Sequence, residues 1–207
     1  MSRPKNSDSA KTYQALVDSA VEVLRQHGPK QVTLRRVSDH SGLSMGTITY
    51  YFATRIELVE ACLDVHYDRV KLAIAEFHRD WSEAPADASI LRRHVAHLVD
   101  IAFADRIFLQ LRASSLGELH RYHSGRLNQH LLPALDLAVQ DLAKALGVKS
   151  TDVRLAALTC NYAIARYAML TDEELPLVVG APTADAARAA IREHMCDVAC
   201  RTLGLAT

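Results

Sequence analysis

The 207-residue sequence balances 24 Lys and Arg residues against 24 Asp and Glu, and 49% of its residues are hydrophobic. No apolar run is long enough to span a membrane, and the four cysteines lack CxxC spacing, so we expect a cytoplasmic protein without a membrane anchor, a zinc ribbon or a disulfide framework. With only eight Gly and six Pro, the composition predicts an all-α chain.

Four helices are expected in the first part of the chain, after a disordered start over residues 1–10. Apolar residues at helical spacing and helix-capping residues place them over residues 11–27, 34–40, 45–52 and 55–81. Thr33, Ser44 and Thr54 each precede a predicted helix as N-cap candidates. Gly42 lies between the second and third helices, which is the pattern of a helix-turn-helix.

Charge is distributed unevenly along the chain. Residues 1–55 contain eight Lys and Arg against four Asp and Glu, a net charge of +4, and the remainder carries −4. A basic end on an acidic body indicates that this end meets a polyanion. Together with the helix-turn-helix pattern, it predicts contact with DNA through the third helix.

The rest of the chain predicts further amphipathic helices, for a total of about nine. They are expected over residues 87–104, 105–116, 118–146, 151–171 and 183–203. Pro133 is expected to kink the long one, and residues 171–182, TDEELPLVVGAP, are expected to form a loop. Cys196 and Cys200 share a face of the last helix, where we expect small buried apolar side chains.

The sequence of residues 33–58 resembles that of the TetR family of bacterial transcription regulators. The resemblance rests on TLRRV at 33–37, GLSMGTI at 42–48, Tyr51-Phe52, Arg55 and Leu58. It implies an N-terminal three-helix DNA-binding domain, residues 1–55, and a C-terminal helical domain for effector binding and dimerisation, residues 56–207. It also implies operator DNA, a small-molecule effector and a homodimer formed by the last two long helices. Two positions depart from the family pattern, with Thr49 in place of a tyrosine and Arg55 in place of a lysine.

On the third helix, Ile48 and Phe52 are expected to face the core. Tyr51 is expected to be offered to DNA, whereas Tyr50 is expected to be shared with the core. The residues predicted to contact DNA lie on the second helix, the third helix and the start of the fourth: Thr33, Arg35, Arg36, Ser44, Met45, Gly46, Thr47, Thr49, Tyr50, Tyr51 and Arg55.

Histidine pairs mark the C-terminal domain. His94 and His97 are three residues apart, as are His120 and His123, with His130 further along. Such pairs suit a metal, a polar ligand, or an ordinary structural role. The predicted ligand-binding residues are His94, His97, Arg112, Tyr122, His123, Asn161, Tyr162 and Arg166. No catalytic residue, metal site or cofactor is predicted.

These features predict a ligand-responsive transcription regulator, most simply a repressor that a small molecule releases from its operator. Two alternatives remain open at this stage. One is a DNA-binding regulator with no effector, and the other is an all-helical enzyme that uses a metal at the histidine pairs. The enzyme is disfavoured because the sequence lacks a phosphate-binding loop and a nucleophile elbow.

Overall fold

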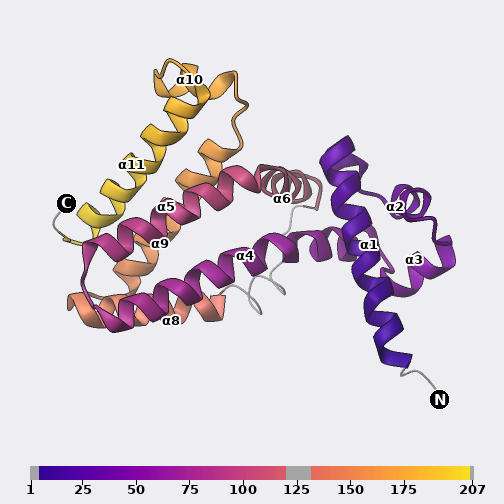
Figure 1. Ribbon diagram of the computed structural model, residues 1–207, viewed down its shortest axis with the longest axis horizontal. Coiled ribbons are helices and arrows are strands. Elements are labelled where there is room, and N and C mark those ends of the chain that lie inside the picture. Colours follow the sequence, from indigo (N-terminus) through magenta and orange to yellow (C-terminus); the bar gives the residue numbers. More distant parts are fainter. Residues whose placement is uncertain (1–4, 120–131, 206–207) are drawn as a thin grey trace. The chain divides into compact units, whose positions relative to one another are not determined.

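The computed structural model describes residues 5–119 and 132–205, and every regular element within them is helical (Figure 1). The all-α prediction is therefore confirmed, with ten α-helices in the described residues. They are α1 (Lys5–His27), α2 (Leu34–Ser41), α3 (Met45–Tyr51), α4 (Arg55–Glu83), α5 (Ala88–Ala104), α6 (Arg106–Leu119), α8 (Leu132–Leu146), α9 (Ser150–Ala168), α10 (Glu174–Val179) and α11 (Ala184–Thr202). Across these residues, no helix has both the length and the apolar character that crossing a membrane requires.

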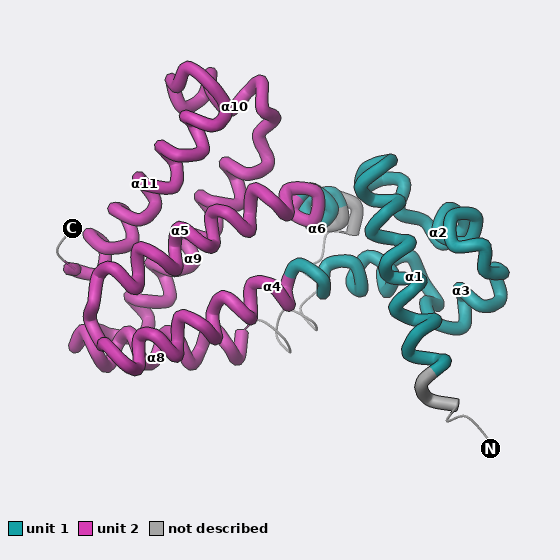
Figure 2. The backbone as a smooth tube through the Cα atoms, in the orientation of Figure 1, with its two compact units in different colours: residues 1–66, 110–124 teal, residues 67–109, 125–207 magenta. Residues whose placement is uncertain are grey.

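The chain forms two compact units, coloured separately in Figure 2. Unit 1 comprises residues 1–66 and 110–124, and unit 2 comprises residues 67–109 and 125–207. Helix α4 contributes its first part to unit 1 and its second part to unit 2. The functional boundary between residues 55 and 56 stays a prediction, because a unit defined by packing is not the same thing as a functional domain.

Unit 1 is built on the apolar stripe of α1. Leu16, Val23 and Leu24 are fully buried there, and the predicted core residues of α3 are buried as well, with Ile48 0% and Phe52 2% exposed. Burying one such side chain contributes about 1.5–3 kcal/mol. The prediction that one face of α3 fixes it to the rest of the unit is confirmed.

Polar caps fix where the helices begin. The hydroxyl of Thr33 accepts from the backbone N–H of Arg36 at 3.2 Å, and that of Ser44 accepts from Thr47 N–H at 3.1 Å. Thr183 caps α11 in the same way, at 3.2 Å from Ala186 N. Each cap satisfies one of the backbone donors that a helix start leaves unpaired.

Two expectations about the helices were wrong. Helix α1 begins at Lys5, inside the segment expected to be disordered. The expected loop at 171–182 contains α10, which begins with a reciprocal pair of hydrogen bonds. Glu174 N–H donates to the Thr171 hydroxyl at 3.1 Å, and Thr171 N–H donates to the Glu174 carboxylate at 2.9 Å. This capping box offsets the cost of starting a helix of only six residues.

The long helix expected over 118–146 lies partly outside the described residues. The described part runs as α8 from Leu132 to Leu146. Pro133 lies at the edge of the described residues, so the kink expected there stays a prediction.

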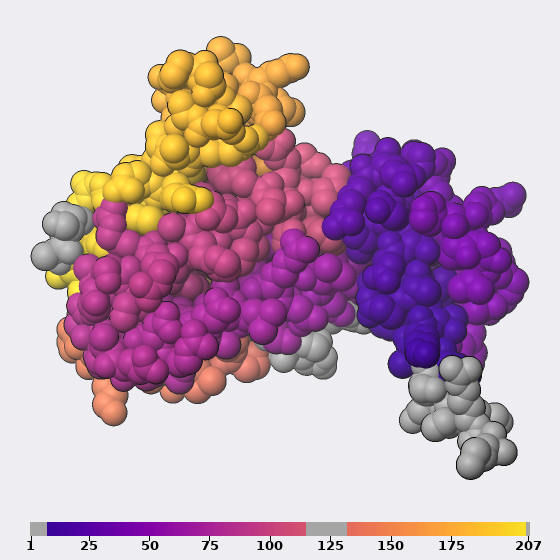
Figure 3. Space-filling view, viewed as in Figure 1, coloured from indigo at the N-terminus to yellow at the C-terminus, as the bar shows by residue number. Residues whose placement is uncertain are grey.

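Unit 2 is organised around α5, against which α11 packs (Figure 3). Its core includes Trp81, Val95, Ile164 and Ile191. Ion pairs line the same contact: Arg92 of α5 donates to Asp197 of α11 at 2.6 Å and also pairs with Glu193. Burial and charge pairing together therefore hold the C-terminal helix on the unit.

All four cysteines are buried thiols, Cys62 in unit 1 and the other three in unit 2. Burial raises the pKa of the Cys62 thiol to about 12. Desolvation likewise raises the pKa values of Cys160, Cys196 and Cys200. The prediction that Cys196 and Cys200 act as small buried apolar side chains agrees with this burial.

Candidate functional site

A sharp turn sets α3 across α2. Gly42 ends α2 in the left-handed region, with φ 71°, and its N–H donates to the Ser38 carbonyl at 3.0 Å. Glycine adopts this conformation without the cost that a Cβ would impose. The Ser38 hydroxyl donates to the Leu43 carbonyl at 2.6 Å, which holds the turn from inside. The two helices and the turn have the geometry of a helix-turn-helix.

The outer face of α3 carries a different set of groups from its inner face. Opposite the buried Ile48, this face exposes Met45 (43%), Gly46, Thr49 and Tyr50 (80%). On α2, Arg35 and Arg36 are exposed as well. This surface combines apolar and aromatic contact area with two guanidinium groups, which suits a groove lined by phosphates.

The exposure of the two tyrosines is the reverse of the one expected, because Tyr50 is the more exposed side chain and Tyr51 the more buried one. Tyr50 is 80% exposed, whereas Tyr51 is half-buried and its hydroxyl lies 3.2 Å from the Ser9 hydroxyl of α1. The Tyr51 ring contacts Tyr13 of α1, at 6.2 Å between centroids, and meets the Tyr50 ring edge-on at 5.1 Å. Tyr51 therefore braces Tyr50, and Tyr50 is the more available of the two.

Several hydroxyls predicted to contact DNA also bond within the domain. Ser44 caps α3, and its oxygen lies 3.0 Å from the Thr47 hydroxyl. The Thr49 hydroxyl donates to the Met45 carbonyl one turn earlier, at 2.9 Å. The Thr49 proton is therefore engaged, as is one of the two protons of the Ser44–Thr47 pair, so these hydroxyls have fewer donors left for a partner.

Packing within the chain does not require a glycine at position 46. A Cβ added there meets only the Ser44 hydroxyl, at 3.7 Å, which is an ordinary contact. A glycine within a helix costs about 1 kcal/mol relative to alanine. Because nothing in the chain explains that cost, an external surface that approaches the backbone closely is the simplest reason for it.

The Arg55 side chain, predicted to contact phosphate, bonds to backbone carbonyl groups of its own chain. Its Nε donates to the Val32 carbonyl at 2.8 Å and its guanidinium to the Pro29 carbonyl at 3.3 Å. It therefore ties the start of α4 to the segment between α1 and α2. This role could not be predicted from the sequence, because the partners are backbone atoms more than twenty residues away.

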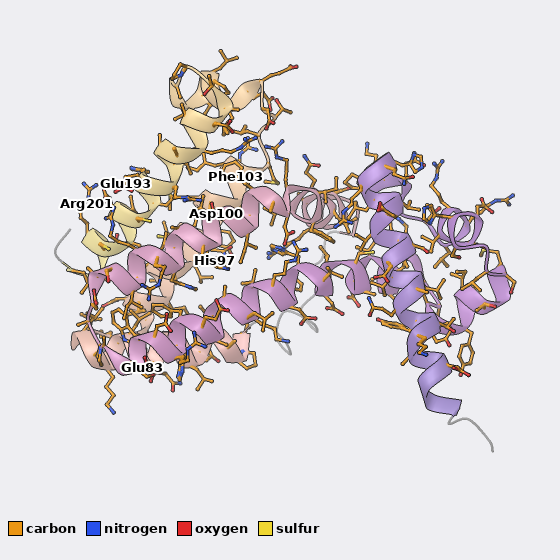
Figure 4. The ribbon with its side chains drawn as sticks, viewed as in Figure 1. Glu83, His97, Asp100, Phe103, Glu193 and Arg201 are labelled. Carbon is orange, nitrogen blue, oxygen red and sulfur yellow. The ribbon has the colours of Figure 1, made fainter. Side chains whose placement is uncertain are left out.

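A second candidate site is a pocket of about 160 Å³ between α4 and α5. Four residues of α4 and four of α5 line it: Ala73, Glu76, Phe77, Asp80, Ile90, Arg93, His94 and His97. The predicted pair His94 and His97 is thus brought to a cavity, and Figure 4 shows His97 on the side of α5 that faces α4. Sequence reasoning missed the α4 wall, although Glu76 and Asp80 stand four residues apart on one helical face.

His94 is the polar group set deepest in this pocket. Desolvation, with a smaller contribution from the charge of His97, lowers its pKa to about 4. Its ring stacks on Phe77, at 4.5 Å between centroids and 29° between planes. A hydrogen bond to the Ala73 carbonyl occupies one ring nitrogen. At neutral pH the ring is uncharged, and its second nitrogen is an acceptor.

The other predicted ligand residues are not gathered here. Asn161, Tyr162 and Arg166 are exposed on α9, Arg112 lies on α6, and none of the four lines this pocket. Tyr122 and His123, with the second histidine pair, fall outside the described residues. Among the residues that the structure does describe, no group of three or more His, Cys, Asp or Glu side chains is arranged to hold a metal ion.

The turn, the buried inner face of α3 and its exposed outer face together form a helix-turn-helix. The family described as bacterial regulatory proteins, tetR family, matches residues 16–62 of this chain. Residues 16–62, which contain α2, the turn and α3, are therefore similar to that family.

Solved structures share the fold over nearly the whole chain. A protein from Mesorhizobium loti described as a TetR-family transcriptional regulator is 15% identical, with a TM-score of 0.64, and the match covers 95% of this chain and 96% of that one. BioQ from Mycobacterium smegmatis is 20% identical, with a TM-score of 0.59 and coverage of 92% and 97%. A TetR-like regulator from Rhodococcus sp. RHA1 is 18% identical, with a TM-score of 0.55 and coverage of 93% and 96%. No curated protein sequence matches the chain.

Proposed function

We propose that the protein is a ligand-responsive repressor that acts in the cytoplasm and is released from its operator by a small molecule bound in unit 2. The observation that carries the proposal is the course of α4. This helix begins at Arg55, directly after the recognition helix α3, and its later residues Ala73 to Asp80 form one wall of the pocket. A ligand in that pocket touches the helix that continues from the DNA-binding domain, which is what coupling between two sites requires.

The DNA contact is assigned to the outer face of α3 and to the exposed arginines of α2. Met45, Gly46 and Tyr50 supply surface for base edges and sugars, and Arg35 and Arg36 supply charge for phosphates or guanine. Thr33, Ser44, Thr47 and Thr49 support this surface from within, and each still offers an oxygen to the partner.

A gel-shift titration with the DNA upstream of the protein's own gene tests the proposal. We expect a sequence-specific complex whose affinity falls steeply as salt rises, and about tenfold weaker binding for Arg35→Ala. Arg201→Ala is the matched control, because Arg201 is an exposed arginine on α11, far along the chain from α2 and α3 (Figure 4). Equal losses for both variants, or no specific complex at all, would refute the assignment.

A homodimer through the last two long helices follows from the exposed apolar residues of α9. Leu155 is 58% and Tyr162 55% exposed, and their spacing of seven residues places them on one face. The stripe expected on the last helix, Ala187, Ile191 and Met195, is buried within the chain instead. The partner would therefore meet the other face of α11, where the small residues Ala189 and Ala190 are exposed and allow close approach.

Light scattering on purified protein tests the dimer. The wild type should have the mass of two chains, and Leu155→Asp combined with Tyr162→Asp should shift it to one. Leu72→Asp is the control, because Leu72 is also exposed (66%) but lies on α4. A dimer that survives the double substitution would place the interface elsewhere. The two-fold arrangement would present two recognition helices to half-sites about 34–36 Å apart.

A further inference from the structure

Charge is not balanced in the pocket between α4 and α5. Two carboxylates line it, Glu76 and Asp80, against one guanidinium, that of Arg93. Arg93 donates to Asp80 at 3.0 Å, and Arg79 donates to Asp80 at 3.2 Å. These hydrogen bonds, that of Arg93 first, lower the pKa of Asp80 and keep it ionised. Arg93 and Asp80 therefore form an ion pair and neutralise each other.

Glu76 is the charged residue of this lining that has no oppositely charged partner among the described residues. Its side chain is exposed, and within the described part of the chain it forms no ion pair or hydrogen bond. Glu76 and Asp80 thus give the lining one more carboxylate than it has guanidinium groups. A carboxylate at the edge of an apolar hollow favours a cation that donates hydrogen bonds.

The inner wall is aromatic and apolar. Phe77 and His94 stack face to face, and Ala73 and Ile90 complete the lining below them. The neutral His94 ring offers an acceptor nitrogen and a π face, both of which attract a donor or a cation. An anion would find neither a charged imidazole nor a free guanidinium in this wall.

The size of the pocket restricts the ligand further. Its volume of about 160 Å³ is close to that of an engineered apolar cavity, about 150 Å³, that accepts benzene. One ring with a short substituent fits such a space.

We propose that this pocket binds a small cationic aromatic compound, a single ring carrying a protonated amine, with the ring against Phe77 and Ile90 and the ammonium group donating to Glu76. The inference deepens the proposed function and rests on it, because it names the chemical class of the effector. It concerns the same cavity and adds Glu76 as the residue that selects for charge.

Calorimetric titration of the full-length protein at pH 7.5 with three probes tests the proposal. Benzylamine, benzyl alcohol and benzoate have the same ring and carry a positive charge, no charge and a negative charge. We expect saturable binding of benzylamine at least tenfold tighter than that of benzoate, with benzyl alcohol between them. Benzoate binding as tightly as benzylamine, or no saturable binding of benzylamine up to 10 mM (roughly the weakest affinity that so small a ligand would show), would overturn the proposal.

Glu76→Gln and Glu83→Gln are the matched variants. Both residues are exposed on α4, but Glu83 lies at the end of the helix and does not line the pocket (Figure 4). Glu76→Gln should weaken benzylamine binding about tenfold and leave benzyl alcohol unchanged, while Glu83→Gln should alter neither. An equal effect of the two variants would show that the attraction is general electrostatics of the surface, and the proposal would fall.

A gel shift in the presence of benzylamine separates this inference from the proposed function. Saturable, Glu76-dependent binding supports the inference whatever the DNA result. Release of the operator at the same benzylamine concentrations supports both. Operator complexes that are insensitive to saturating benzylamine would refute the effector role while leaving the binding site in place.

Discussion

Replacing Gly46 by alanine should separate folding from DNA binding. The new methyl group would lie 3.7 Å from the Ser44 hydroxyl and meet no other neighbour, so the fold accepts it without strain. Alanine is favoured over glycine within a helix by about 1 kcal/mol, and the gain near a helix start is somewhat smaller. For a chain of this size we expect the midpoint of thermal unfolding to rise by about 1–3 °C.

DNA affinity should change in the opposite direction. If the backbone at Gly46 approaches the groove closely, one added methyl group forces the helix outward and costs about 1–3 kcal/mol, which is about fivefold to 150-fold in affinity. Fluorescence anisotropy with labelled operator DNA measures the loss, and circular dichroism on the same preparation measures the unfolding midpoint. Gly46→Val should weaken binding further. Unchanged affinity in a stabilised Gly46→Ala protein would refute the claim that this glycine serves DNA contact.

Three further predictions concern stability. Protonation of His94 should destabilise the fold, because the pKa of His94 in the folded chain, about 4, lies below its ordinary value of 6.5. The unfolded chain therefore takes up the proton first, and stability falls as pH drops from 6.5 towards 4, by about 3 kcal/mol at the limit. Urea titrations between pH 4.5 and 7.5 should show a shallower pH dependence for His94→Phe than for the wild type, and parallel curves would contradict the prediction. Among the described residues, the buried Trp81 Nε1 has no hydrogen-bond partner. Removing it in Trp81→Phe relieves a penalty of about 1–3 kcal/mol that offsets the lost packing, so the free energy of unfolding should stay within about 1 kcal/mol of the wild type. A loss of several kcal/mol in a chemical denaturation followed by circular dichroism would show that the indole N–H is satisfied. Thr33→Ala should cost about 1 kcal/mol through loss of the α2 cap, and Thr33→Ser should restore most of it; equal midpoints for Thr33→Ala and the wild type would show that the cap contributes nothing.

The sequence predicted helix starts well because caps are local. Thr33, Ser44 and Thr183 each act within three residues of the backbone donor that they satisfy, so the pattern and the structure agree. Helix α10 was missed although it carries a local signal, the Thr171–Glu174 box followed by Gly180. Its brevity and its proline favoured a loop over a helix.

Features that depend on distant parts of the chain were not predictable in this way. The exposure of Tyr50 and the burial of Tyr51 are set by Ser9 and Tyr13, which lie about forty residues earlier. Arg55 turns towards carbonyl groups of another segment for a similar reason. The pocket depends on which faces of α4 and α5 meet, and periodicity within one helix cannot specify its partner.

The buried cysteines give each unit its own reporter of local opening. A thiol that is desolvated and protonated reacts only when the surrounding structure opens, so the labelling rate of Cys62 follows unit 1 and that of Cys160, Cys196 and Cys200 follows unit 2. A ligand in the pocket should slow labelling in unit 2, and operator DNA should slow labelling of Cys62. The natural sequence thus allows the two binding events to be followed separately in one protein without introducing a label.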